Sequence, residues 1–148
     1  MQPKTDIWQF QAALSRRLLA WSGLSVGLGS ALALLADPVW RGFGTQCAGW
    51  GLIDAVIAGL GLRQTHQKVA QPNAHEPGQQ SEARTKLRRI LWINTGLDIG
   101  YVAGGIVLAA TKGRRGSNHR FWRGSGWGIV VQGGFLLIFD LIHALLLP

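Results

Sequence analysis

The chain has 148 residues, of which 47% are hydrophobic and only 15% are charged, and its mean hydropathy is +0.16. This composition excludes an ordinary water-soluble domain, and the single cysteine, Cys47, excludes an intramolecular disulfide and a cysteine-rich zinc site. The 15 Lys and Arg residues outnumber the 7 Asp and Glu residues. Because these bases lie beside apolar segments, lipid headgroups fit them better than nucleic acid does.

Four apolar segments predict four membrane-spanning helices, each near the roughly 20 residues that cross a bilayer. The first ends before Asp37-Pro38, because proline cannot extend the hydrogen bonding of a preceding helix. The predicted fold class is an all-α integral membrane four-helix bundle that forms one domain over residues 1–148. Its helices are expected at about 18–36, 42–62, 90–111 and 127–147.

The first apolar segment could instead be a cleaved signal peptide. Arg16 and Arg17 precede it, and Ala31-Leu32-Ala33 has the small-residue spacing of a cleavage site. Its apolar region is longer than the usual 7 to 15 residues of such peptides. A retained membrane anchor is therefore favoured.

Two polar connections differ in character. Residues 63–80 lack periodicity and aromatic side chains, which predicts a flexible polar loop, and Ser81 is expected to cap the next helix in water. The connection 112–126 is rich in arginine and aromatic residues, which suits a layer of anionic lipid headgroups. Its expected headgroup contacts are Arg114, Arg115, Arg120 and Arg123.

The distribution of basic residues predicts the orientation. Nine Lys and Arg residues lie on the side of the N-terminus and the 63–89 segment, and six lie on the other side. The positive-inside rule then places both termini in the cytoplasm, although five of those six bases lie in the 112–126 connection and argue against this orientation. The expected location is the inner membrane of a bacterium, with several membrane crossings.

Three of the seven acidic residues lie within the predicted spans. Counted at 1.5 Å per residue from the face that carries the 63–89 segment, Asp54, Asp98 and Asp140 all lie roughly 11–12 Å deep. Ser25 reaches the same depth, and Asn94 and His143 lie nearer that face. Residues three or four apart share a helix face, so we expect one intramembrane polar cluster. Its predicted members are Asp54, Asp98, Asp140, Asn94, Gln132, His143, Tyr101 and Ser25.

The predicted spans hold no Lys or Arg, so His143 is the one cationic partner that this pattern offers the three aspartates. They cannot all be charged in a bilayer, which points to a bound proton, a bound cation or a protonated histidine. Two further interpretations stay open. The aspartates could be neutral and hydrogen-bond other helices, or Asp140 and His143 could belong to a metal-binding bundle enzyme, although that architecture needs two such pairs.

Gly96, Gly100 and Gly104 form two overlapping G-x-x-x-G spacings, which are typical of close helix packing in membranes. They predict either that the third helix is central in the bundle or that it forms a homodimer interface. The tripeptide Gly-Trp-Gly occurs at 49–51 and at 126–128, which hints at an internal duplication.

The segments 94–105 and 126–140, read as Asn-x-Gly-Leu-Asp-x-x-Tyr-x-x-Gly and Gln-Gly-x-Phe-Leu-Leu-x-Phe-Asp, resemble a family of small bacterial four-helix membrane proteins classed as a domain of unknown function. Gly49–Asp54 is similar to the same family. The resemblance implies a bacterial membrane protein and no particular activity.

The function expected from these patterns is a non-enzymatic structural or interaction component of a bacterial membrane, without cofactor or resident metal. Its partners would be the bilayer, anionic lipids and a second copy or another membrane protein. The alternative is a small proton- or cation-coupled carrier that uses the intramembrane aspartates.

Overall fold

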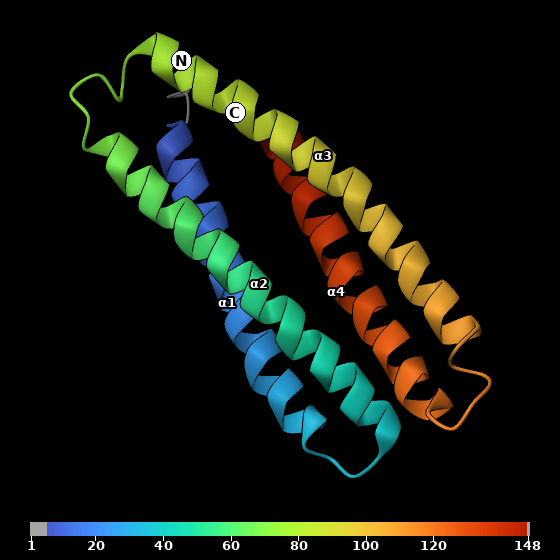
Figure 1. Cartoon of the computed structure of the whole chain (residues 1–148). Helices are drawn as coiled ribbons and strands as arrows, with labels where there is room; N and C mark the ends of the chain where they lie inside the picture. The colour runs from blue at the N-terminus through green and yellow to red at the C-terminus, as the bar shows by residue number, and fades with distance from the viewer. Residues whose placement is uncertain (1–5, 148) are drawn as a thin grey trace.

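The computed structural model describes residues 6–147, which form four α-helices and no strand. Figure 1 shows two antiparallel helical hairpins, α1–α2 and α3–α4, with both chain ends at the same end of the bundle. The predicted all-α class is therefore confirmed. The helices are α1 (Ile7–Ala33), α2 (Pro38–Val69), α3 (Pro77–Ala110) and α4 (His119–Leu146).

Helices α2, α3 and α4 are long and apolar enough to cross a membrane. Helix α1 does not reach the same apolarity, because it ends at Ala33 and its most apolar 18-residue stretch still contains Arg16 and Arg17. It nevertheless lies along α2 for most of its length (Figure 1). Three potential spans are thus established, and a fourth crossing by α1 stays a prediction.

The helices continue beyond the apolar runs that predicted them. Helix α2 extends to Val69 and α3 begins at Pro77, so the expected irregular loop over 63–80 is wrong and only residues 70–76 connect the two helices. Proline suits the first helical position, where no amide hydrogen is needed, and the N-cap is Glu76 instead of Ser81. Hydropathy marks the part of a helix that lipid surrounds, whereas helical hydrogen bonding continues into water.

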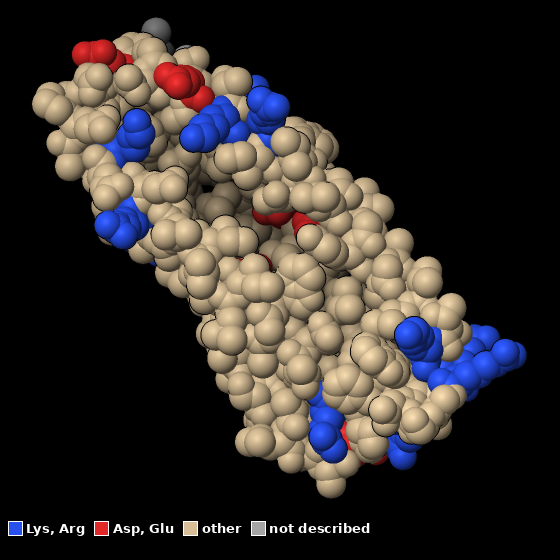
Figure 2. Space-filling view, viewed as in Figure 1, with Lys and Arg blue, Asp and Glu red and all other residues tan. Residues whose placement is uncertain are grey.

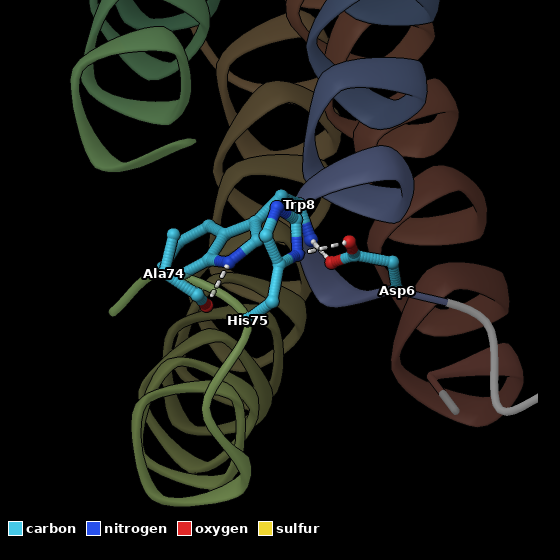
Figure 3. A network of polar contacts seen from close by, with 4 residues as sticks. All are labelled: Asp6, Trp8, Ala74 and His75. Carbon is cyan, nitrogen blue, oxygen red and sulfur yellow. Dashed lines mark hydrogen bonds and ion pairs between the residues drawn. The ribbon is translucent and has the colours of Figure 1, made fainter. Parts of the chain in front are cut away.

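The connection 70–76 is fastened to the start of α1 (Figure 3). The indole Nε1 of Trp8 donates a hydrogen bond of 2.8 Å to the carbonyl oxygen of Ala74. The Nδ1 atom of His75 lies 3.0 Å from a carboxylate oxygen of Asp6, the residue that caps α1. These contacts hold the α2–α3 connection against the N-terminal end of the bundle.

Helices α2 and α4 form the centre of the bundle, because they pack on each other, and α1 and α3 pack on the outside of α2 and α4 respectively. The prediction that α3 is central is wrong. A Cβ atom added at Gly96, Gly100 or Gly104 would meet nothing within 4 Å, so this glycine stripe makes no close helix contact within the chain. The stripe faces outward, and its role as a homodimer interface stays a prediction.

Other glycines bring the helix backbones together in two matching seams. A Cβ at Gly44 of α2 would lie against the carbonyl oxygen of Gly29 in α1. A Cβ at Gly126 of α4 would lie 2.6 Å from the carbonyl oxygen of Gly105 in α3. Each hairpin therefore closes through the same glycine-to-glycine contact.

The contacts between the hairpins are reciprocal as well. A Cβ at Gly42 would strike the carbonyl oxygen of Phe121, and a Cβ at Gly124 would strike that of Val39. Trp40–Gly44 and Trp122–Gly126 share the pattern Trp-Arg-Gly-x-Gly. The two hairpins are thus related by a pseudo-twofold axis along the bundle.

This pseudosymmetry extends along the helices. Gly51 packs on Val26, and Gly133 packs on Val102, which are the equivalent positions of the two hairpins. An internal duplication explains both the repeated pattern and the repeated contacts. The register suggested by the two Gly-Trp-Gly tripeptides is wrong, because the structure aligns residues 38–62 of α2 with 120–144 of α4.

Candidate functional site

The polar residues expected to form one cluster separate into two groups and a pair. The first group, called here the carboxylate cluster, lies between α2, α3 and α4 and consists of Asp54, Asp98, Asp140 and Asn94. The second group, called here the glutamine group, lies between α1 and α4 and consists of Trp21, Ser25 and Gln132. His143 forms a separate contact with Arg17 of α1.

The three carboxylates of the carboxylate cluster are nearly inaccessible, with Asp54 and Asp98 each 3% exposed and Asp140 7% exposed. The side chain of Asn94, one turn before Asp98 on α3, lies near the carboxylate of Asp140. The carboxylates of Asp54 and Asp98 lie close enough to Asp140 to interact with it electrostatically. The three aspartates that the sequence placed at one depth therefore also lie near one another in the structure.

Two oxygen atoms of this cluster have no hydrogen-bond partner among the described residues. They are Oδ2 of Asp54 and Oδ2 of Asp98, and both are buried. A buried acceptor without a partner is costly and is uncommon in folded proteins. The hydrogen-bonding capacity of the carboxylate cluster is therefore not fully used by the described residues.

The partners expected for neutral aspartates lie elsewhere. Gln132 donates from Nε2 to Ser25 at 3.2 Å and accepts from the indole of Trp21 at 3.1 Å. Tyr101 packs edge-on against Trp50, with ring centroids 4.8 Å apart. These contacts satisfy the glutamine group and leave the carboxylate cluster with Asn94.

The surface is hollowed above the carboxylate cluster (Figure 2). Acidic atoms line the inside of this hollow, which lies between α2 and α3, two helices that do not pack closely on each other. The basic residues lie toward the two ends of the molecule and leave a largely uncharged band between them (Figure 2). The hollow opens within that band.

His143 is held by two hydrogen bonds. Its Nδ1 lies 2.7 Å from the carbonyl oxygen of Phe139, and its Nε2 lies 3.1 Å from Nη1 of Arg17. Because guanidinium groups only donate, Nε2 of His143 is the acceptor in the contact with Arg17. Both ring nitrogens of His143 therefore contact groups other than the three aspartates. The contact with Arg17 could not be predicted from the sequence, in which that arginine marks only the edge of the first apolar run.

The pseudosymmetry identifies which residues of the other half occupy the positions equivalent to those of the carboxylate cluster. Asn94 and Asp140 occupy the positions that correspond to Leu18 and Ala58 in the other half of the bundle. Leu18 and Ala58 pack together with Phe139 in an apolar core. Apolar side chains therefore fill the equivalent place in the other half of the bundle.

The other end of the bundle carries the predicted headgroup contacts. Arg114, Arg115, Arg120 and Arg123 are all exposed, and Nη2 of Arg120 contacts the Asp37 carboxylate at 2.6 Å. Asp37 also caps α2 through the amide of Val39. Arg120 therefore links the starts of α2 and α4, and headgroup binding stays a prediction for all four arginines.

Within residues 6–147, no three His, Cys, Asp or Glu side chains are arranged so that they could hold a metal ion. The metal-binding bundle interpretation required Asp140 and His143 together with further ligands. Asp140 instead faces Asn94, and His143 faces Arg17.

A family model described as a family of unknown function, DUF6992, matches residues 17–141. The chain belongs to the DUF6992 family. The matched stretch includes every member of the carboxylate cluster and of the glutamine group. The resemblance to a domain of unknown function is thereby confirmed. No curated protein and no solved structure matches this DUF6992 chain.

Proposed function

We propose that this DUF6992 protein is a small proton- or cation-coupled carrier of a bacterial inner membrane. In this proposal the carboxylate cluster takes up and releases the proton or cation. The observation that carries it is the pair of buried, unpartnered oxygens on Asp54 and Asp98 beside Asp140. No catalysed covalent step is involved.

Electrostatics supports this proposal. Three carboxylates inside a bilayer cannot all carry uncompensated charge, because desolvating even one charge is costly. A proton or a bound cation would compensate them, and the unpartnered oxygens are the atoms that would receive it. The alternative of inert polar contacts between helices has less support, since an apolar pair fills the equivalent position in the other half of the bundle.

The packing supports access from one end. Glycine seams close the helices backbone to backbone near the 34–37 and 111–118 connections, through Gly42, Gly44, Gly124 and Gly126. The carboxylate cluster lies on the other side of these seams, toward the 70–76 connection and both termini. With the termini in the cytoplasm, the hollow would open toward the cytoplasmic half of the bilayer. Release on the far side would require the seams to separate.

The test is ion flux into liposomes that contain the purified full chain. We expect an imposed pH gradient to drive measurable proton or cation movement, and we expect Asp98→Asn to abolish it. Glu82→Gln is the matched control, because Glu82 is an exposed acidic residue on the same helix. Absence of flux in the native chain, or equal flux in Asp98→Asn, would refute the proposal.

A second candidate function, a structural or interaction component, is favoured by the outward-facing glycine stripe of α3. Small residues on a lipid-facing surface let another helix approach closely. Gly100→Cys in a Cys47→Ser background is expected to form a disulfide-linked dimer under mild oxidation in the membrane. Leu24→Cys, at an exposed position of α1, measures cross-linking from random collisions in the membrane. If Gly100→Cys does not cross-link more than Leu24→Cys, contact along this stripe is refuted.

A further inference from the structure

We propose that the cation of the carboxylate cluster is an organic ammonium with an apolar substituent. This inference rests on the proposed carrier function and adds the chemical class of its substrate. Its basis is the juxtaposition of unpartnered buried carboxylates with an aromatic pair that joins the same two helices, α2 and α3.

The aromatic pair lies beside the carboxylates. Trp50 is one turn before Asp54 on α2, and Tyr101 is one turn after Asp98 on α3, so each ring shares a helix face with a carboxylate. The two rings meet edge-on at an interplanar angle of 64° and join α2 to α3. Tyr101 is 39% exposed and Trp50 is partly exposed, so the rings are not enclosed by the core.

Carboxylates and aromatic faces together are the groups that proteins use to bind ammonium ions. The negative charge compensates the cation, and the ring quadrupole attracts it when water is excluded. Divalent metal ions instead need several oxygen ligands at about 2.0–2.6 Å. The described residues do not provide such a set.

The pseudosymmetry allows the aromatic pair to be compared with the residues at the equivalent positions. Trp50 and Tyr101 occupy the positions that correspond to Gln132 and Ser25, which hydrogen-bond each other in the other half. A polar, self-satisfied pair therefore fits the same place in the fold. At these two equivalent positions the aromatic pair lies only on the side that carries the carboxylates, and the stacked pair Trp21–Phe135 on the other side uses different positions.

The surroundings favour a substrate with an apolar part. Ile53 and Leu97 directly precede Asp54 and Asp98, and they are 50% and 53% exposed. In a bilayer such side chains face lipid tails. An ammonium with an apolar substituent could therefore approach the cluster from the membrane.

The experiment is calorimetric titration of the full chain in detergent with benzyltrimethylammonium. We expect saturable binding of this cation. Its uncharged carbon isostere, neopentylbenzene, should show none. Asp98→Asn should weaken binding at least ten-fold, and Glu82→Gln should leave it unchanged.

The double variant Trp50→Gln with Tyr101→Ser tests the aromatic pair while it retains a side-chain pair that this fold already contains. It should fold normally and bind about ten-fold more weakly, as expected for loss of a desolvated cation–π contact. Unchanged affinity in this variant, or equal binding of the uncharged isostere, would overturn the inference. If Asp98-dependent proton or sodium flux occurs in liposomes but the ammonium ion does not bind, the ammonium inference is wrong and the carrier proposal stands. If neither flux nor ammonium binding is found, the carrier proposal is wrong as well.

Discussion

The relation between the two hairpins predicts the effect of replacing Asn94, Asp98 and Asp140, the members of the carboxylate cluster that lie on α3 and α4. The triple variant Asn94→Leu, Asp98→Ser, Asp140→Ala places in the second half the residues that the first half carries as Leu18, Ser22 and Ala58. The backbone already accommodates these residues, because Leu18 and Ala58 pack together and Ser22 donates to the carbonyl oxygen of Leu18 at 2.7 Å. The new serine can satisfy itself in the same way.

We expect the triple variant to be at least as stable as the native chain. Replacing buried charged groups by well-packed apolar ones is often neutral or stabilising by about 1–4 kcal/mol. The single variant Asn94→Leu should instead destabilise the chain by about 1–3 kcal/mol, because the buried carboxyl group of Asp140 then has an apolar neighbour in place of a polar one. The effects should therefore be strongly non-additive.

The assay is equilibrium unfolding in mixed micelles, followed by far-ultraviolet circular dichroism. Asp37→Asn, which is remote from the carboxylate cluster and retains a capping side chain, serves as the control. A triple variant that is less stable than the native chain by more than about 1 kcal/mol would refute the reasoning, since the carboxylates would then be required for folding.

Three further predictions concern stability. Gly126→Ala should lower the free energy of unfolding by about 1–3 kcal/mol, because its Cβ would lie 2.7 Å from the backbone nitrogen of Ala109. Gly100→Ala meets open space and should be neutral or slightly stabilising, and thermal unfolding compares the two variants. Trp8→Phe should lower the free energy of unfolding by about 0.5–1.5 kcal/mol, because the hydrogen bond to the carbonyl oxygen of Ala74 is lost. Amide hydrogen exchange in residues 70–76 should become faster, and unchanged exchange there would show that Trp8 does not hold this connection. Asp37→Ala should cost about 0.5–2 kcal/mol by uncapping α2, and an unaltered midpoint would show that the cap contributes little.

Hydropathy and helical periodicity were sufficient to predict the helices and the common depth of the three aspartates. Apolar runs of bilayer length can be satisfied only by helices, and a fixed rise per residue converts sequence position into depth. Asp54, Asp98 and Asp140 could therefore be brought to one layer before any packing was known. The same reasoning could not locate the helix ends, because a helix continues past the lipid boundary wherever no residue breaks it.

Packing set the features that periodicity leaves open. The stripe Gly96, Gly100, Gly104 and the seam glycines have the same chemistry, and only the approach of a neighbouring backbone distinguishes them. Gln132 shares a helix face with Asp140, yet it is two turns away and pairs with α1. The reciprocal glycine contacts revealed the duplicated hairpins. Equivalent positions in the two hairpins make matching backbone contacts, although most of them carry different side chains. That comparison shows that Asn94 and Asp140 stand where the other half of the bundle packs Leu18 and Ala58.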